Sequence, residues 1–341
     1  MWAAKGYRSY RGRPPKGKIA LAVVLVLVIL VSLAVIVLQE YVVYDADGNP
    51  RVEFPWQSTE KDQQPEEPTN VEIVVQEPEV PDGSKILYLA DTPLTDDTVA
   101  AGLAEQGYDA VAVTVKDSTG SVYFDAAAAL PAAQKDTEAT GAALRALTNS
   151  DLHTIAQLSC FLDSRAANAD VEGRGLKNTG GYIFYDGNNL NWLDPAKEGT
   201  RTYLGELAVE CADLGFDEIL LTDFTFPTEG KLDKIQYPEE GMEASLTGFL
   251  AAMRTTLDQA GHEDVLLSVE LPADAVLTGR DETAGLVLEE IAPLVDRIYA
   301  RTIETQAQEL SDAVTAAGGG LFVPELQEQP QDLKAYLVEA D

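Results

Sequence analysis

The fold of this chain is decided by one stretch of sequence, Gly215-Phe216-Asp217-Glu218-Ile219-Leu220-Leu221-Thr222-Asp223-Phe224-Thr225-Phe226-Pro227. Its first residue is typical of a helix end, residues 218–222 are typical of a short buried strand, and the polar tip that follows stops at a proline. This order places Thr222 and Asp223 at the carboxyl end of a strand, where α/β folds carry their chemistry. The stretch therefore predicts an α/β fold with a functional site at this strand end.

Short apolar strands and helical patterns alternate on both sides of this stretch. Strands are expected at 86–90, 110–115, 154–159, 218–222, 265–270, 297–300 and 321–323, and helices at 96–106, 137–147, 200–214, 244–260, 284–294, 305–317 and 331–338. Such alternation is typical of a parallel sheet covered by helices, and seven units favour a TIM-barrel-like domain over an open doubly wound sheet. The eighth strand is missing at the carboxyl end. Either residues 71–76 supply it from the front, or the barrel is incomplete.

The amino-terminal part of the chain has the composition of a membrane anchor. Residues 1–18 contain six basic residues and no acidic one, and Ser32 is the only polar residue in the apolar run 19–38. A helix of that length spans the apolar core of a bilayer. The basic flank predicts a single-pass protein with a cytoplasmic amino terminus and an extracytoplasmic carboxyl-terminal domain in the cell membrane. A cleaved signal peptide is the alternative, but the run is long for one and no small-residue cleavage site follows it.

Four regions follow from these patterns. They are a basic cytoplasmic tail at 1–18, a transmembrane helix at 19–38 in contact with the lipid bilayer, a hairpin with an acidic, proline-rich stalk at 39–84, and the barrel domain at 85–341.

Charge and composition exclude several functions. The net formal charge is −33, and a surface this negative repels phosphate backbones, so nucleic acid is not an expected partner. The only two histidines, His153 and His262, are expected at the opposite rim of the barrel, and Cys160 and Cys211 lie in apolar segments. We therefore expect no metal site, no cofactor, and two buried thiols.

Charged residues recur at the expected carboxyl ends of the strands. Asp223, Glu270 and Glu325 follow the fourth, fifth and seventh strands, and Arg301 follows the sixth. Glycoside hydrolysis requires two carboxyl groups that face each other across a bond. We expect Asp223 to be one of them and Glu270 the other, acting as a general acid with a raised pKa, with Glu325 as an alternative partner of Asp223. The opposing interpretation is that these acids cap loops and face water.

The connection at 161–199 is long for a compact domain, which is typical of a functional loop. It contains Tyr185 and Trp192 among several glycine and asparagine residues. Aromatic faces and amide side chains suit sugar rings, so this connection is a candidate binding surface. The alternative is that the aromatic side chains fix the loop to the barrel.

Four segments in this order resemble the bacterial putative glycoside hydrolases that have an α-amylase-like TIM barrel. Residues 115–120 are similar to the V-K-D-x-x-G of that family, 192–195 to its W-x-D-P, 215–227 to its G-F-D-E-I-Q-F-D-Y-I-R-F-P, and 268–270 to its S-A-D. The resemblance implies that Lys116, Asp117, Trp192 and Asp194 belong to a substrate site, to which we add Tyr185 and Arg301. Thr222 stands where the family has the aspartate that is its nucleophile candidate, and Thr225 stands where it has an arginine.

The expected function is that of a membrane-anchored, extracytoplasmic glycoside hydrolase that acts on a polysaccharide or cell-wall glycan through a carboxylate pair. The two threonines at motif positions favour an alternative of another class. In that alternative, the barrel is catalytically inactive and binds a glycan or a protein at the cell surface.

Overall fold

The computed structural model describes residues 42–44, 50–52, 84–89 and 94–339, in two compact units, Met1–Val74 and Val75–Asp341. In the first unit, β1 (Val42–Tyr44) and β2 (Pro50–Val52) pair in an antiparallel hairpin, which confirms the hairpin expected there. The predicted membrane helix at 19–38 and the candidate strand at 71–76 lie outside the described residues. No helix among the described residues is long and apolar enough to cross a membrane.

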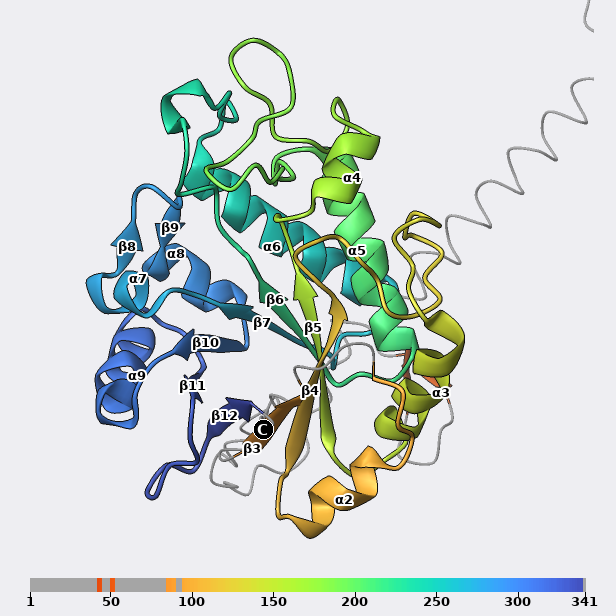
Figure 1. Cartoon of the computed structure of the whole chain (residues 1–341). Helices are drawn as coiled ribbons and strands as arrows, with labels where there is room; N and C mark the ends of the chain where they lie inside the picture. The colour runs from red at the N-terminus through yellow and green to blue at the C-terminus, as the bar shows by residue number, and fades with distance from the viewer. Residues whose placement is uncertain (1–41, 45–49, 53–83, 90–93, 340–341) are drawn as a thin grey trace, which may run out of the picture. The chain divides into compact units, whose positions relative to one another are not determined.

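The second unit is a closed barrel of eight parallel strands (Figure 1), which confirms the TIM-barrel expectation and rules out the open sheet. In order around the barrel, the strands are β3 (Lys85–Leu89), β4 (Ala110–Lys116), β5 (His153–Ser159), β6 (Glu218–Thr222), β7 (Leu266–Glu270), β10 (Arg297–Arg301), β11 (Leu321–Leu326) and β12 (Tyr336–Glu339). Because all the strands run the same way, their carboxyl ends meet at one rim.

The closing strand is where the sequence-based prediction is wrong. The pattern at 331–338 predicts a helix, but β12 is a strand that pairs with β11 on one side and β3 on the other. Leu337 belongs to the cluster that fills the barrel, whereas Tyr336 and Val338 belong to the cluster outside it. Both faces of this short strand are therefore buried. An apolar run without alternation cannot be told from a helical segment by its period alone.

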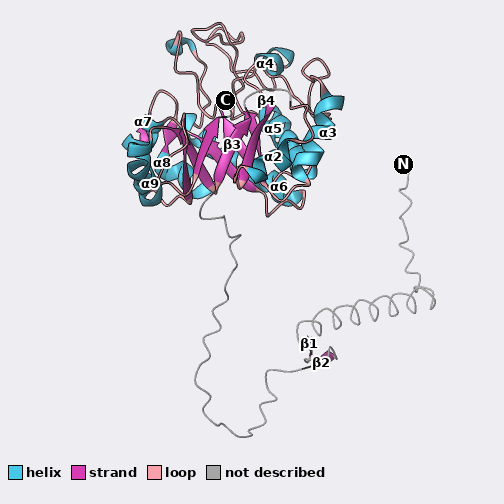
Figure 2. Cartoon of the chain, turned by 60° about the horizontal axis from the view of Figure 1, so that its bottom comes forward, coloured by secondary structure: helices cyan, strands magenta, loops and turns pink. Residues whose placement is uncertain are grey.

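Helices cover the outside of the strands (Figure 2). The longer ones are α2 (Val99–Glu105), α3 (Thr137–Thr148), α5 (Glu198–Asp213), α6 (Met242–Gln259) and α9 (Ala307–Ala316). Shorter elements are α4 (Ser164–Ala169), η1 (Leu232–Lys234), α7 (Ala273–Thr278), β8 (Arg280–Asp281), β9 (Leu286–Val287), α8 (Leu288–Ile291), η2 (Ala292–Leu294) and η3 (Glu304–Gln306). The helix predicted at 284–294 is thus split into β9, α8 and η2. Gly285 has a φ of 77° and Pro293 lacks a backbone N–H, so neither suits the interior of a single helix.

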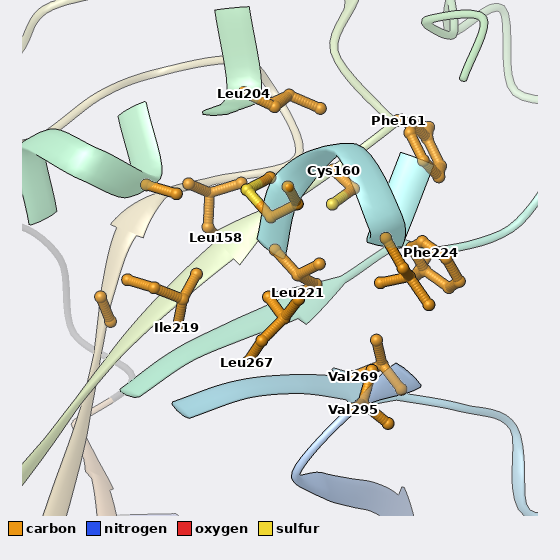
Figure 3. Packing of buried hydrophobic residues seen from close by; sticks show 14 of the residues in the cluster. Leu158, Cys160, Phe161, Leu204, Ile219, Leu221, Phe224, Leu267, Val269 and Val295 are labelled. Carbon is orange, nitrogen blue, oxygen red and sulfur yellow. The ribbon is translucent and has the colours of Figure 1, made fainter. Parts of the chain in front are cut away.

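The core has two layers separated by the strands. The outer layer packs strands against helices, and Figure 3 shows Leu158, Leu221 and Leu267 on neighbouring strands, in one cluster with Leu204 of α5. Cys160 and Cys211 are free and buried in this outer layer, as expected. The inner layer fills the barrel with Ile86, Ala110, Ala112, Ile155, Leu220, Tyr299, Val323 and Leu337. Alternate residues of each strand face the two layers, as in other barrels.

A buried ion pair closes the amino end of the barrel. Arg297 Nη1 donates to Glu218 Oε2 over 2.9 Å, and Tyr299 Oη donates to Glu218 Oε1 over 2.9 Å, with both ionic side chains fully buried. His153 Nε2 lies 2.8 Å from Glu218 Oε2. These residues begin or lie within their strands, so His153 is at the rim opposite the strand ends that carry Asp223 and Glu270. The interior therefore has an ionic layer below its apolar middle.

Candidate active site

A cavity of about 430 Å³ lies at the carboxyl ends of the strands. It brings together five residues predicted for the site from the sequence, namely Lys116, Asp117, Asp223, Glu270 and Arg301. Its full lining is Tyr88, Thr114, Lys116, Asp117, Ser118, Gln157, Ser159, Thr222, Asp223, Glu270 and Arg301. Five successive barrel strands, β4 to β7 and β10, contribute their last residues or the residues just after them.

Asp223 reaches this cavity because its backbone turns. Side chains of neighbouring residues on a strand point to opposite faces, so Asp223 would face away from Thr222 if the strand simply continued. Instead Asp223 has a φ of 49°, in the left-handed region that few residues other than glycine adopt. Ser159 Oγ donates a hydrogen bond of 2.6 Å to Asp223 Oδ2 and fixes the carboxylate. Unfavourable backbone geometry of this kind is concentrated at functional sites.

Arg301 joins two further carboxyl groups. Its Nε lies 3.7 Å from Glu270 Oε1 and 3.4 Å from Glu325 Oε2. Since both distances are measured to the same atom, the two oxygens are at most about 7 Å apart. The Arg301 side chain is 78% exposed, whereas that of Glu325 is only 9% exposed. The structure thus places Glu270 and Glu325 on two sides of one solvent-facing cation.

Both glutamates retain protons more readily than exposed carboxyl groups. Burial raises the pKa of Glu270, the Arg301 charge lowers it, and the Asp223 charge raises it again, with a net rise. Burial and the charge of Glu270 raise the pKa of Glu325 to about 8, against the opposing effect of Arg301. At neutral pH this pair holds a proton next to Asp223. A proton donor beside another carboxyl group is the arrangement that general acid catalysis requires.

We expect Glu325→Gln to stabilise the fold at alkaline pH. Between the ordinary pKa of 4.5 and about 8, the folded protein holds a proton that the unfolded chain releases, so the wild type loses stability as pH rises through this window. Glutamine removes this pH dependence. The free energy of unfolding should therefore rise by about 1 kcal/mol at pH 8 and by less at pH 5. Urea denaturation at both pH values measures the difference.

Glu328→Gln, at an exposed position, is the control for this variant. An equal effect of Glu325→Gln at the two pH values would contradict the raised pKa of Glu325.

A row of polar side chains lies inside the barrel, below the strand ends at which the functional residues were predicted. Thr114 Oγ1 donates to Gln157 Oε1 over 2.8 Å, and Tyr88 Oη lies 2.7 Å from the same Thr114 oxygen. A threonine hydroxyl has one proton, so Tyr88 donates to Thr114. The available signal was the presence of Thr114 and Gln157 in otherwise apolar strands, two residues before Lys116 and Ser159. This period of two puts all four on the inner face.

Lys116 and Asp117 line the cavity and also stabilise the segments that form its rim. Lys116 is fully buried, forms an ion pair of 3.0 Å with Asp163 Oδ2, and donates to the Ser159 carbonyl over 2.7 Å. Asp117 Oδ1 accepts backbone hydrogen bonds from Thr119 and Ser121, which tightens the following turn.

Gly120, the last residue of the V-K-D-x-x-G motif, has a φ of 79°, and a Cβ there would clash with the Asp163 carboxylate. The motif therefore has a structural explanation at each of its polar and glycine positions.

Three predicted binding residues lie in the connection at 161–199 and outside the lining of this cavity. Trp192 is buried, and its Nε1 donates to Asp186 Oδ2 over 2.9 Å. Asp194 Oδ1 accepts from the backbone N–H of Ala196 over 3.0 Å, and burial raises the pKa of Asp194. Tyr185 is 53% exposed. Trp192 and Asp194 thus stabilise the connection, and the expected role of all three residues in sugar binding stays a prediction.

The sequence matches, over residues 89–301, the family described as "Putative glycosyl hydrolase domain". This match spans more than half of the chain, and the protein belongs to that family. It confirms the resemblance drawn from the four motifs. The matched range includes Asp223 and Glu270 and ends at Arg301, so Glu325 and the closing strand β12 lie beyond it.

Several solved structures are similar to this one. A hypothetical protein from Ruminiclostridium thermocellum ATCC 27405 is 27% identical, with a TM-score of 0.46 over 54% of this chain and 96% of that one. A cycloisomaltooligosaccharide glucanotransferase from Paenibacillus sp. is 15% identical, with a TM-score of 0.48 over 73% of this chain and 39% of that one. The glycoside hydrolase domain of PelA from Pseudomonas aeruginosa is 17% identical, with a TM-score of 0.41 over 73% and 85% of the two chains. No curated protein gave a match.

Proposed function

We propose that the protein hydrolyses glycosidic bonds in a polysaccharide or cell-wall glycan. The observation that carries this proposal is the meeting of three carboxyl groups at one rim of the barrel, with a proton retained by Glu270 and Glu325 beside Asp223. A glycosidase needs a protonated and an ionised carboxyl group on two sides of the bond that it breaks. Membership of the family agrees with this chemistry.

Glu270, Asp223, Glu325 and Arg301 have different roles in the proposed hydrolysis. Glu270 gives its proton to the oxygen of the leaving sugar, and the bond between that oxygen and the anomeric carbon breaks. Asp223, held by Ser159, faces the carbon as a carboxylate and stabilises the positive charge that develops there. Burial and the charge of Asp223 keep the pKa of Glu270 raised, while Arg301, which lies beside both glutamates, orients the pair. Water then bonds through its oxygen to the anomeric carbon and gives one proton to the Glu270 carboxylate, which restores the enzyme, so no cofactor takes part in this scheme.

We further propose that residues 19–38 anchor the protein in the cell membrane with the barrel outside the cytoplasm. The support is the apolar run itself and the six basic residues that precede it. The glycan substrate would then be met at the cell surface. Protease digestion of intact cells tests this placement, because a barrel on the outside is degraded while the basic tail is protected.

A second candidate function is glycan binding without cleavage. Thr222 lines the cavity, and it stands where the family motif that residues 215–227 resemble has an aspartate. A threonine does not form the usual glycosyl ester. In this alternative, Asp223 and the polar row would only make hydrogen bonds with sugar hydroxyl groups.

Release of new reducing ends from soluble glycans distinguishes the two functions. The full-length protein in mild detergent is incubated with starch, pullulan, dextran, xylan, chitosan and peptidoglycan. Cleavage of one of them is expected, and Asp223→Asn should slow it by about a hundredfold or more because the charge at the anomeric carbon is no longer stabilised. Asp233→Asn, at a side chain that is 71% exposed, is the matched control and should have no effect. Folded protein that binds a glycan but cleaves none would favour the second function.

A further inference from the structure

A second cavity, of about 660 Å³, lies beside the first. Tyr88 and Arg301 line both cavities. The second cavity is formed by the residues after β10, the ends of β11 and β12, and the loop between these two strands. Its remaining lining residues are Thr302, Ile303, Glu304, Glu325, Leu326, Gln327, Glu328, Gln329, Gln331, Leu337 and Glu339. Amide and hydroxyl groups beside the exposed Ile303 make a surface that suits a sugar ring.

The carboxyl groups of the site are divided between the two cavities. Asp223 and Glu270 line the first, whereas Glu325 lines the second. Arg301 contacts Glu270 and Glu325 and belongs to both linings. The proton-holding pair therefore lies at the boundary of two cavities. In an enzyme that removes terminal sugars, we would expect the pair at the closed end of one cavity.

Both cavities extend to the surface of the barrel rim. Ser118 is an exposed lining residue of the first cavity. In the second cavity, Ile303 is 61% exposed and Gln327 is also an exposed lining residue. Each cavity is therefore open to solvent at the rim among these residues, and neither encloses a sugar completely.

We propose that a glycan chain lies across both cavities and is cut at their boundary, so that the enzyme cleaves within polymers. This proposal rests on the hydrolase function proposed above and specifies its substrate as the interior of a chain. Sugar units on one side of the broken bond occupy the first cavity, and units on the other side occupy the second. The second cavity has four glutamates and one arginine, so uronic acid polymers are repelled and the substrate is neutral or cationic.

The test follows polymer size and reducing ends together, on whichever polymer of the panel the full-length protein cleaves. Cleavage within chains lowers the mean molar mass steeply while few bonds have been cut, and it yields oligosaccharides. Size-exclusion chromatography with light scattering measures the mean molar mass, and chromatography of the small products identifies the oligosaccharides. Release of monosaccharide alone, with a slow fall in molar mass, would overturn the proposal and leave the hydrolase function intact.

Variants that fill one cavity at a time sharpen the test. Ser118→Trp narrows the first cavity and Gln327→Trp the second, and each is expected to slow polymer cleavage by about tenfold. Gln308→Trp, on the exposed face of α9 and outside both linings, is the matched control and should leave the rate unchanged. Wild-type rates in Gln327→Trp would show that the second cavity holds no substrate and overturn the proposal. If the wild type cleaves no glycan of the panel, both this inference and the proposed function fail.

Discussion

Glu270→Gln is expected to slow glycan hydrolysis by about 10²–10⁴-fold while the barrel stays folded. Glutamine has nearly the same shape as glutamate and can occupy the same place beside Arg301, but it has no acidic proton to give to the leaving oxygen. Initial rates on the cleaved glycan, with circular dichroism as a check of folding, measure the effect. Glu282→Gln, at a side chain that is 81% exposed, is the matched control.

The pH dependence separates a proton donor from a merely charged residue. A general acid works only while protonated, so the wild-type kcat/KM should fall on the alkaline side as the glutamate pair loses its proton. In Glu325→Gln, Glu270 no longer has Glu325 as an acidic neighbour whose charge opposes its ionisation, so the pKa of Glu270 is lower. The alkaline fall should then move to lower pH. If Glu270→Gln retained more than about a tenth of the wild-type rate, Glu325 would be the donor instead.

Most of the barrel could be predicted from the sequence because its strands carry local signals. Seven strands are short apolar runs bounded by helical patterns, and each is found within a few residues of its expected place. The strand that closes the barrel carries no such signal. Residues 336–338 have apolar side chains toward both layers, and they form a strand only through pairing with β11 and with Ile86 of β3, which is far away in the sequence. Contacts of this kind are set by tertiary structure and override local preference.

The site was predictable in its residue types and less so in its geometry. Asp223, Glu270, Glu325 and Arg301 could be found because charged residues after apolar strands mark the carboxyl rim of a barrel. The left-handed backbone at Asp223, which brings its carboxylate beside Thr222, has no sequence signal of its own. The position of Arg301 between Glu270 and Glu325 likewise depends on the strand order, because β10 lies between β7 and β11 in the barrel. A residue's type can be read locally, but its partners depend on the order of strands around the barrel.

Glu218→Ala is expected to lower the free energy of unfolding by about 3–5 kcal/mol, since it leaves the buried Arg297 without its counterion. Burial alone would raise the pKa of Glu218, but the hydrogen bond with His153 and the charge of Arg297 outweigh it and leave the pKa below its ordinary value. Glu218 is therefore ionised in the fold at neutral pH, and its stabilising contribution is lost as pH falls through this lowered pKa. Urea denaturation at pH 7 measures the change.

Glu172→Ala is the matched control for this loss. Glu172 pairs with Lys177 at the surface, where its side chain is 79% exposed, and removal of such a pair costs about 0–1 kcal/mol. If Glu218→Ala were no more destabilising than Glu172→Ala, the buried pair would contribute nothing to the fold.

Replacing both Glu218 and Arg297 should change the free energy of unfolding much less than removing Glu218 alone. Among the described residues, Arg297 Nε and Nη2 are buried without a hydrogen-bond partner. The hydrogen bonds of Arg297 therefore do not fully offset the free-energy cost of removing its guanidinium group from water. Glu218→Leu combined with Arg297→Met removes both charges and keeps the volume of the layer, and such replacements are often neutral or stabilising by about 1–4 kcal/mol. We therefore expect the double variant to be more stable than Glu218→Ala by several kcal/mol and to retain hydrolysis, because the ionic layer and the carboxyl rim lie at opposite ends of the barrel with the apolar layer between them. A double variant that unfolds as readily as Glu218→Ala would instead show that the ion pair itself selects the packing of the barrel interior.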